Sequence, residues 1–147
     1  MYKHLLVPTD GSALSNAAVK KAMAFAHGMD ARVTVLTVIE PFRMLSLNPE
    51  QLENTRAEFD RHADLVADKV LREAEEVAAA IGTTCSTLRM KSSDPARAIV
   101  EVAASNDCDL IAMASHGREG LKAFMIGSVT MKVLANSKLP VLVYRES

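Results

Sequence analysis

The sequence predicts an α/β fold, a doubly wound, five-stranded parallel sheet with helices on both faces. Short runs of β-branched and apolar residues alternate with segments of helical period along the 147 residues. Strands that alternate with helices pair in parallel, because each helix carries the chain back to the edge where the next strand begins. The segment Asp109–Ala114 is almost continuously apolar, which is typical of a central parallel strand covered on both faces.

The first half of the chain predicts two strands, each followed by a helix. Lys3–Pro8 is a short apolar strand that ends in turn residues, and Ser12 is the N-cap candidate of a helix that Gly28 closes at its C′ position. Ala31–Ile39 is rich in β-branched residues and predicts the second strand. The long amphipathic segment Pro49–Ile81 predicts the second helix.

Each of these two helices is expected to bury one apolar stripe. The stripe of the first helix consists of Leu14, Ala18, Ala22, Phe25 and Met29. The stripe of the second consists of Leu52, Phe59, Val66, Val70, Val77 and Ile81. The other face of the second helix is acidic, which fits a solvated face or an acidic interaction surface. The loop before it is compatible with a pocket lid or with an apolar loop without that role, and its apolar residues are Phe42, Met44, Leu45 and Leu47.

The second half predicts three strands that alternate with two helices. Thr83–Met90 is the third strand, and Asp94 caps the helix that follows it. After the central strand and a loop over 115–126, a helix is expected from about Gly127 to Ser137. The last strand is expected over Leu139–Tyr144. No linker, repeat or low-complexity stretch interrupts this order, so a single domain over 1–147 is expected.

Composition and charge exclude several classes of protein. Hydrophobic residues make up 49% of the chain and charged residues 24%, as in globular proteins. The net charge of −1 provides no cationic field for nucleic acid or an anionic membrane. No apolar run is long enough to span a bilayer, and the first residues do not have the pattern of a signal peptide. Cys85 and Cys108 lack metal-site or dithiol spacing, so no metal is predicted and a cytoplasmic location is expected.

A ligand site is expected beyond the carboxyl ends of the strands, where ligands bind in open parallel sheets. The segment after the fourth strand holds three of the chain's 6 glycines, Gly117, Gly120 and Gly127. Gly127-Ser128-Val129 begins a helix, whose free amides and positive dipole end favour a phosphate. Four basic residues against Glu119 make this region locally positive: Arg118, Lys122, Lys132 and Lys138.

Two interpretations of these residues stay open from the pattern alone. The glycines and Ser128 either approach a phosphate or only turn the chain and cap a helix. Asp10, which follows the first strand, either accepts a hydrogen bond from a ligand amine or only forms an Asp-Gly turn.

Several motifs together resemble the universal stress protein family. They are the opening Leu-Leu-Val-Pro-Thr-Asp-Gly-Ser, the helix start at Asp94-Pro95-Ala96, the Gly117-x9-Gly127-Ser128 spacing and the closing Leu-Pro-Val-Leu-Val. The resemblance runs from Lys3 to Arg145. It implies a Rossmann-like domain of the adenine nucleotide alpha hydrolase type, usually homodimeric and made in bacteria under starvation or other stress.

The resemblance also implies an ATP site, because some members bind ATP through the pattern G-x-x-G-x9-G-[ST]. Carried onto this chain, Asp10 and the Val38 backbone contact adenine, and Met113 and Ala114 flank the ribose. The phosphates, with or without Mg²⁺, lie against Gly117, Gly127, Ser128 and Val129. The first glycine of the pattern is Ala114 here, which costs about 1–2 kcal/mol if the position needs a positive φ and little if it does not.

The sequence offers little support for an enzyme. Ser115 and His116 are adjacent, but the chain lacks the G-x-S-x-G elbow and an aspartate downstream. The Walker A and dinucleotide-binding glycine patterns are absent. At most, slow ATP hydrolysis is expected, with no catalytic residue assigned. The functional alternatives are a nucleotide-binding regulatory module and a dimeric stress-response interaction protein that binds no nucleotide, each with an unidentified regulatory partner.

The last strand carries the expectation of a homodimer. Val141–Tyr144 is apolar, and an edge strand with unpaired backbone groups invites pairing with a second copy. The resemblance implies the same strand as the dimer interface. If helices cover the strand, it has no such role.

Overall fold

The computed structural model describes residues 1–41, 49–117 and 126–145, without the side chains of residues 49–54. The apolar loop residues Phe42, Met44, Leu45 and Leu47 lie outside this part of the chain, as do Arg118, Glu119, Gly120 and Lys122. The elements in chain order are β1 (His4–Pro8), α1 (Ala13–Gly28), β2 (Arg32–Ile39), α2 (Pro49–Ile81), β3 (Cys85–Lys91), α3 (Pro95–Ser105), β4 (Leu110–Ala114), α4 (Ser128–Asn136) and β5 (Val141–Tyr144).

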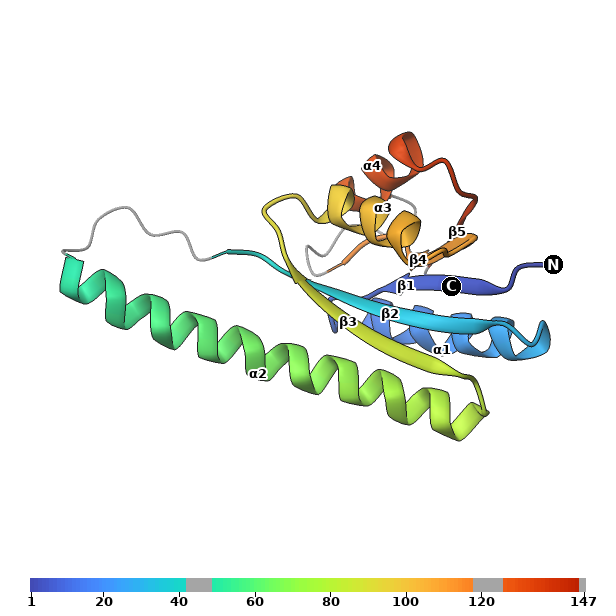
Figure 1. The fold of residues 1–147 in the computed structure, drawn as a ribbon, viewed down its shortest axis with the longest axis horizontal. Helices are drawn as coiled ribbons and strands as arrows, with labels where there is room; N and C mark the ends of the chain where they lie inside the picture. Colours follow the sequence, from blue (N-terminus) through green and yellow to red (C-terminus); the bar gives the residue numbers. More distant parts are fainter. Residues whose placement is uncertain (42–48, 118–125, 146–147) are drawn as a thin grey trace.

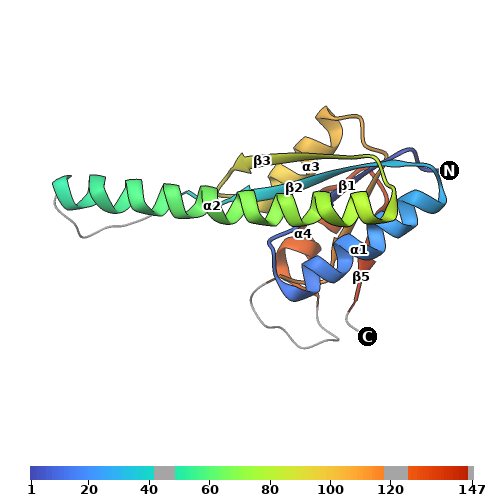
Figure 2. The same cartoon turned by 90° about the horizontal axis from the view of Figure 1, so that it is seen from below.

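The five strands form one parallel sheet in the order β3-β2-β1-β4-β5 (Figure 1). Helices α1 and α2 cover one face, and α3 and α4 cover the other (Figure 2). Alternate residues of β1 enter the two resulting cores, since Leu5 and Val7 pack with α1 and α2 while Leu6 packs with α3 and α4. The predicted doubly wound α/β fold is confirmed. No helix in the described ranges is long and apolar enough to cross a membrane.

Helix α1 differs from the prediction in its end and in its buried face. The helix runs through Gly28, and the left-handed residue of its exit is Asp30, with φ 55°. The buried residues are Ser15, Ala18, Val19, Ala22, Met23 and Ala26. Phe25, predicted to be buried, is 39% exposed. The predicted stripe is confirmed at Ala18 and Ala22 and wrong at Phe25, because the face against the sheet is turned toward Val19, Met23 and Ala26.

Among the side chains of α2 that the structure describes, those buried against the sheet lie in the second half of the helix. They are Ala67, Val70, Leu71, Ala74 and Ala78. Phe59, predicted to be buried, is 39% exposed, because the first half of the helix projects past the ends of β2 and β3 (Figures 1 and 2). Val77 and Ile81 are partly buried against the core, as predicted.

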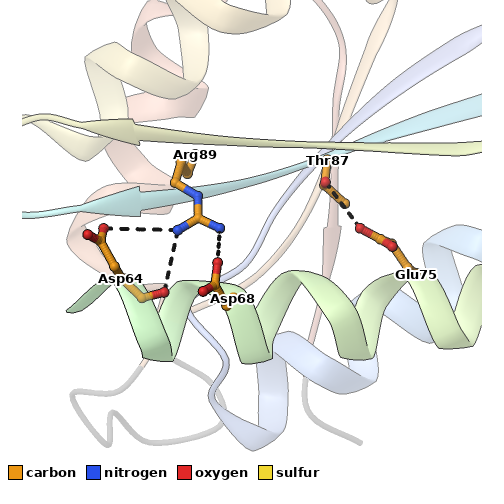
Figure 3. Close-up of polar contacts among 5 residues, drawn as sticks. All are labelled: Asp64, Asp68, Glu75, Thr87 and Arg89. Atoms are coloured by element: carbon orange, nitrogen blue, oxygen red, sulfur yellow. Dashed lines mark hydrogen bonds and ion pairs between the residues drawn. The ribbon is translucent and has the colours of Figure 1, made fainter. Parts of the chain in front are cut away.

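Polar contacts join α2 to the edge strand β3 (Figure 3). The Arg89 guanidinium forms an ion pair with Asp68 and donates to the Asp64 carbonyl at 3.4 Å, while the Thr87 hydroxyl donates to Glu75 at 3.3 Å. The charged side chains of these contacts are exposed, so each contact contributes about 1 kcal/mol or less to stability. Along α2 these contacts begin at Asp64, where the first half of the helix, which extends beyond the sheet, ends.

Candidate functional site

The strand order reverses between β1 and β4, which makes the gap between their carboxyl ends the expected ligand crevice. The β1–β4 ladder pairs only Leu5 with Leu110 and Leu6 with Ile111. Both strands continue beyond these pairs, β1 to Pro8 and β4 to Ala114. The two strands therefore diverge as they approach the predicted site residues.

A tight turn presents Asp10 at the end of β1. The Asp10 carboxylate accepts a hydrogen bond from the Ser12 amide at 2.9 Å, and the Thr9 hydroxyl accepts one from the Gly11 amide at 3.2 Å. Gly11 has φ 80°, a conformation that glycine adopts without strain. Ser12 is the N-cap of α1, as predicted, and accepts from the Ser15 amide. The turn thus fixes one oxygen of Asp10 and holds the carboxylate at the strand end.

Gly117 lies directly against this carboxylate. A Cβ atom at Gly117 would be 2.2 Å from Oδ2 and 3.2 Å from Cγ of Asp10. No side chain fits there unless the carboxylate moves. The two segments that the sequence identified after the first and the fourth strands therefore meet at this point, through Asp10 and Gly117.

The start of α4 is docked against the end of β4. Gly127 is its N-cap, and its amide donates to the Ser115 carbonyl at 2.7 Å. A Cβ at Gly127 would be 3.0 Å from the Cβ of His116, so glycine permits this close approach. The first turn of α4 has no side-chain cap, and Ser128 is exposed. Amides at an uncapped helix start provide donors and a positive dipole end for an anion.

The remaining predicted residues line the strands rather than the crevice surface. Ala114 is 5% exposed and is absent from the described non-glycine residues with positive φ, which are Asp30 and Asp107. The departure from glycine at this position therefore brings no backbone strain. Met113 is 5% exposed with its side chain in the core under α3 and α4. Val38 is half-buried in β2, opposite Met90.

Two polar residues beside the site carry features that the sequence analysis missed. The Thr130 hydroxyl, on a residue 2% exposed, donates to the Ala114 carbonyl at 3.0 Å. The Ser115 hydroxyl is fully buried and has no hydrogen-bond partner within the described part of the chain. A threonine in a first helical turn and a serine after a strand are common, so the sequence contains no signal that distinguishes these two.

Two hollows among the described residues lie away from this crevice. One, of about 250 Å³, lies at the amino ends of β1 and β2 beside Lys3, Arg32 and Gly82. The other, of about 380 Å³, lies between α1 and α2 and reaches the end of β1 only at Thr9. None of the eight predicted site residues lines either hollow.

Comparisons with known proteins agree on one family. A model of the universal stress protein family matches residues 1–145. Universal stress protein MJ0531 of Methanocaldococcus jannaschii is 34% identical over 147 residues, which is 99% of this chain and 84% of the relative. The structure of UspA from Lactobacillus plantarum gives a TM-score of 0.80 at 25% identity over 98% of both chains. A universal stress protein solved in complex with cAMP gives a TM-score of 0.73 at 28% identity over 99% of both chains.

Proposed function

Because this chain belongs to the universal stress protein family, we propose that it is a cytoplasmic stress-response regulator that binds ATP between the carboxyl ends of β1 and β4. The observation that carries the proposal is the contact of Asp10 with Gly117 close to the uncapped start of α4. One crevice then contains the Asp10 carboxylate, which can accept a hydrogen bond from the base amine. It also contains the amides at the start of α4, which can bind phosphates. The relative solved with cAMP supports an adenine nucleotide as the ligand class.

Each predicted residue has a role in this proposal. The Asp10 carboxylate accepts a hydrogen bond from the adenine amine, and the Val38 backbone contacts the ring. Met113 and Ala114 flank the ribose, with Met113 acting through its backbone because its side chain is buried.

The phosphates bind toward the start of α4, and Gly117 lies between that start and Asp10. Glycine at 117 and 127 allows the backbone to approach them, and the amides at Ser128 and Val129 donate to them. Any Mg²⁺ would be held mainly by the phosphates, as is usual for this ion with nucleotides, and no group of three or more His, Cys, Asp or Glu side chains suited to a metal lies in the described ranges.

A homodimer through β5 is the second part of the proposal. Val141–Tyr144 forms one edge of the sheet, and each of its residues is only partly buried. The other edge, β3, carries exposed Arg89 and Lys91, and charged side chains on an edge strand oppose pairing with a second sheet. The β5 edge is therefore the one that fits a second copy of this chain.

Isothermal titration of about 10 μM protein with Mg·ATP tests the nucleotide site, since a Kd of about 1 μM corresponds to about −8 kcal/mol and gives a clear isotherm. We expect saturable heat from the wild-type protein and none from Gly127→Glu. A glutamate side chain at position 127 would also press against His116, so a loss of binding in Gly127→Glu could come from altered packing. Ser128→Glu is therefore the second variant. It adds an anion at an exposed position where acidic residues stabilise a helix, so Tm should hold or rise while ATP binding falls.

The outcomes separate the two candidate functions. Flat heats from the wild-type protein, with no change in Tm at millimolar ATP, would favour a dimeric interaction protein that binds no nucleotide. Binding that survives in both glutamate variants would place the ligand somewhere other than the start of α4.

A further inference from the structure

The last residues of β4 are not paired with β1, so their backbone groups on that side have no hydrogen-bond partner in the sheet. The amides of Ile111 and Ser115 donate to Pro140 and Tyr144 of the β5 segment at 3.1 and 2.9 Å. Backbone groups of successive strand residues point to opposite sides, so the carbonyl of Ala114 is directed to the β1 side. The β1–β4 ladder has already ended at Leu6 and Ile111, which leaves that carbonyl without a strand partner.

The Thr130 hydroxyl supplies the missing hydrogen bond. It donates to the Ala114 carbonyl at 3.0 Å, and Thr130 is 2% exposed. Threonine in a helix commonly bonds to a carbonyl of its own preceding turn, whereas Thr130 reaches a different element across 16 residues of chain. The bond therefore joins the first turn of α4 to the diverging end of β4.

A second bond completes the attachment. The Gly127 amide donates to the Ser115 carbonyl at 2.7 Å. The adjacent carbonyls of Ala114 and Ser115 at the end of β4 thus hold the third residue of α4, Thr130, and its N-cap, Gly127. Ser128 and Val129, whose amides are proposed to bind phosphate, lie between these two fixed points.

We propose that Thr130 is a positioning residue for the nucleotide site, which keeps the amides of Ser128 and Val129 in the geometry that phosphate binding requires. This inference rests on the proposed ATP site. Thr130 is buried beneath the first turn and acts through the backbone of Gly127–Val129 rather than by contact with the ligand. Sites that are held in advance by supporting hydrogen bonds lose affinity when the support is removed.

Thr83 provides a matched control at the opposite end of the molecule. It is also a buried threonine, 8% exposed, whose hydroxyl donates to a backbone carbonyl, that of Met23, at 2.9 Å. It lines the hollow at the amino ends of the strands, away from the crevice. Thr83→Val therefore removes the same kind of bond without touching the site.

The experiment measures Kd for Mg·ATP and Tm for the wild-type protein, Thr130→Val, Thr130→Ser and Thr83→Val. We expect Thr130→Val to weaken ATP binding by about tenfold or more, and Thr130→Ser to restore it to within about threefold of wild type. Thr83→Val should leave Kd unchanged even where its Tm falls. If Thr130→Val does not fold, Thr130→Ala tests the same loss of the hydroxyl without added bulk.

Three results would overturn the inference when the wild-type protein binds ATP. They are wild-type affinity in Thr130→Val, no recovery in Thr130→Ser, and an equal loss in Thr83→Val, which would mean that affinity only follows stability. Failure of the wild-type protein itself to bind ATP contradicts the proposed function instead, so the two failures are distinguishable.

Discussion

Gly117 and Asp10 lie so close together that a single added methyl group at Gly117 would overlap the carboxylate, at 2.2 Å from Oδ2. The other Asp10 oxygen, Oδ1, accepts from the Ser12 amide, so the carboxylate can move away only by giving up its turn. This contact joins the loop after β4 to the turn after β1 and defines one end of the proposed crevice.

Gly117→Ala is therefore expected to weaken ATP binding by displacing Asp10. A hydrogen bond to a charged group contributes about 1.5–3 kcal/mol, so the loss should be about tenfold or more in Kd. Gly28→Ala is the matched control, because a Cβ there meets nothing within 4 Å. The control should keep wild-type affinity and lose no stability. In a double-mutant cycle, Gly117→Ala should add little to Asp10→Ala, and full additivity would contradict the displacement.

Ala114→Gly is expected to lower stability and leave ATP affinity within about twofold of wild type. Ala114 is buried in β4 and does not have a positive φ, so glycine relieves no strain there. Glycine in a strand destabilises by about 0.5–1 kcal/mol relative to alanine, which urea denaturation will detect. Much tighter ATP binding by this variant would mean that the methyl group obstructs the ligand.

Dimerisation through β5 should depend on the outward backbone groups of Val141 and Val143. Pro140 and Tyr144 direct their carbonyls to β4. Because backbone groups point to alternate sides along a strand, those of Val141 and Val143 point to the free edge. Val143→Pro removes an outward amide without touching the β4 ladder. This variant and the double variant Val141→Lys, Val143→Lys are both expected to be monomeric by light scattering at wild-type helix content. Dimers of both variants would exclude this edge.

His4 is expected to make stability depend on pH. It is buried at the start of β1, and its Nε2 lies 2.7 Å from the Thr34 hydroxyl, which lies 3.0 Å from that of Ser86. Burial, with Arg32 nearby, lowers the pKa of His4, against the opposing effect of neighbouring carbonyls and Asp109. The neutral imidazole is therefore the form that the folded protein favours.

The sign and the window follow from that lowered pKa. The pKa of His4 in the folded protein is below the unfolded value of about 6.5. The stabilisation that neutral His4 provides is therefore complete above about pH 6.5 and is lost as the pH falls through the folded pKa. The free energy of unfolding should decrease as the pH falls below about 6.5 in the wild-type protein, and should decrease less in His4→Gln. Equal pH dependence in both proteins would contradict this role.

Asp109 acts in a separate, more acidic window. Burial opposes its ionisation, but hydrogen bonds from the His4 and Lys3 amides outweigh that effect and lower the pKa of Asp109. The stabilisation that the ionised Asp109 carboxylate provides is present above about pH 4 and is lost at lower pH. The change that is due to His4 occurs at higher pH and can be measured separately.

The element order could be predicted from the sequence because each strand and helix carries its own period and end signals. Ser12 and Asp94 both proved to be N-caps, and the apolar run of β4 is buried throughout. The buried face of α1 could be predicted only in part. Ala18 and Ala22 were predicted to be buried and are, but the burial of Met23 and Ala26 depends on which side of the helix meets the sheet. The exposure of Phe59 depends on where the sheet ends, which only the assembled strands determine.

The candidate site could be predicted in part for a related reason. The rule that ligands bind at carboxyl strand ends identified the segments of Asp10, Gly117 and Gly127 from the sequence. The strand order, which brings β1 next to β4, depends on pairing between distant segments and cannot be predicted from the local pattern of apolar and polar residues. The role of Thr130 depends on that order, because its hydroxyl matters only where the β1–β4 ladder stops short.

Amide chemical shifts recorded during an ATP titration will report where the nucleotide binds. In a ¹⁵N-labelled sample, saturable shifts are expected at Asp10, Gly117, Ser128 and Val129, with no shifts at Thr83 and Thr84 at the opposite end of the strands. A spectrum in which the amides of Ser128 and Val129 stay unchanged at saturating ATP, or in which only the opposite end responds, would contradict phosphate binding at the start of α4.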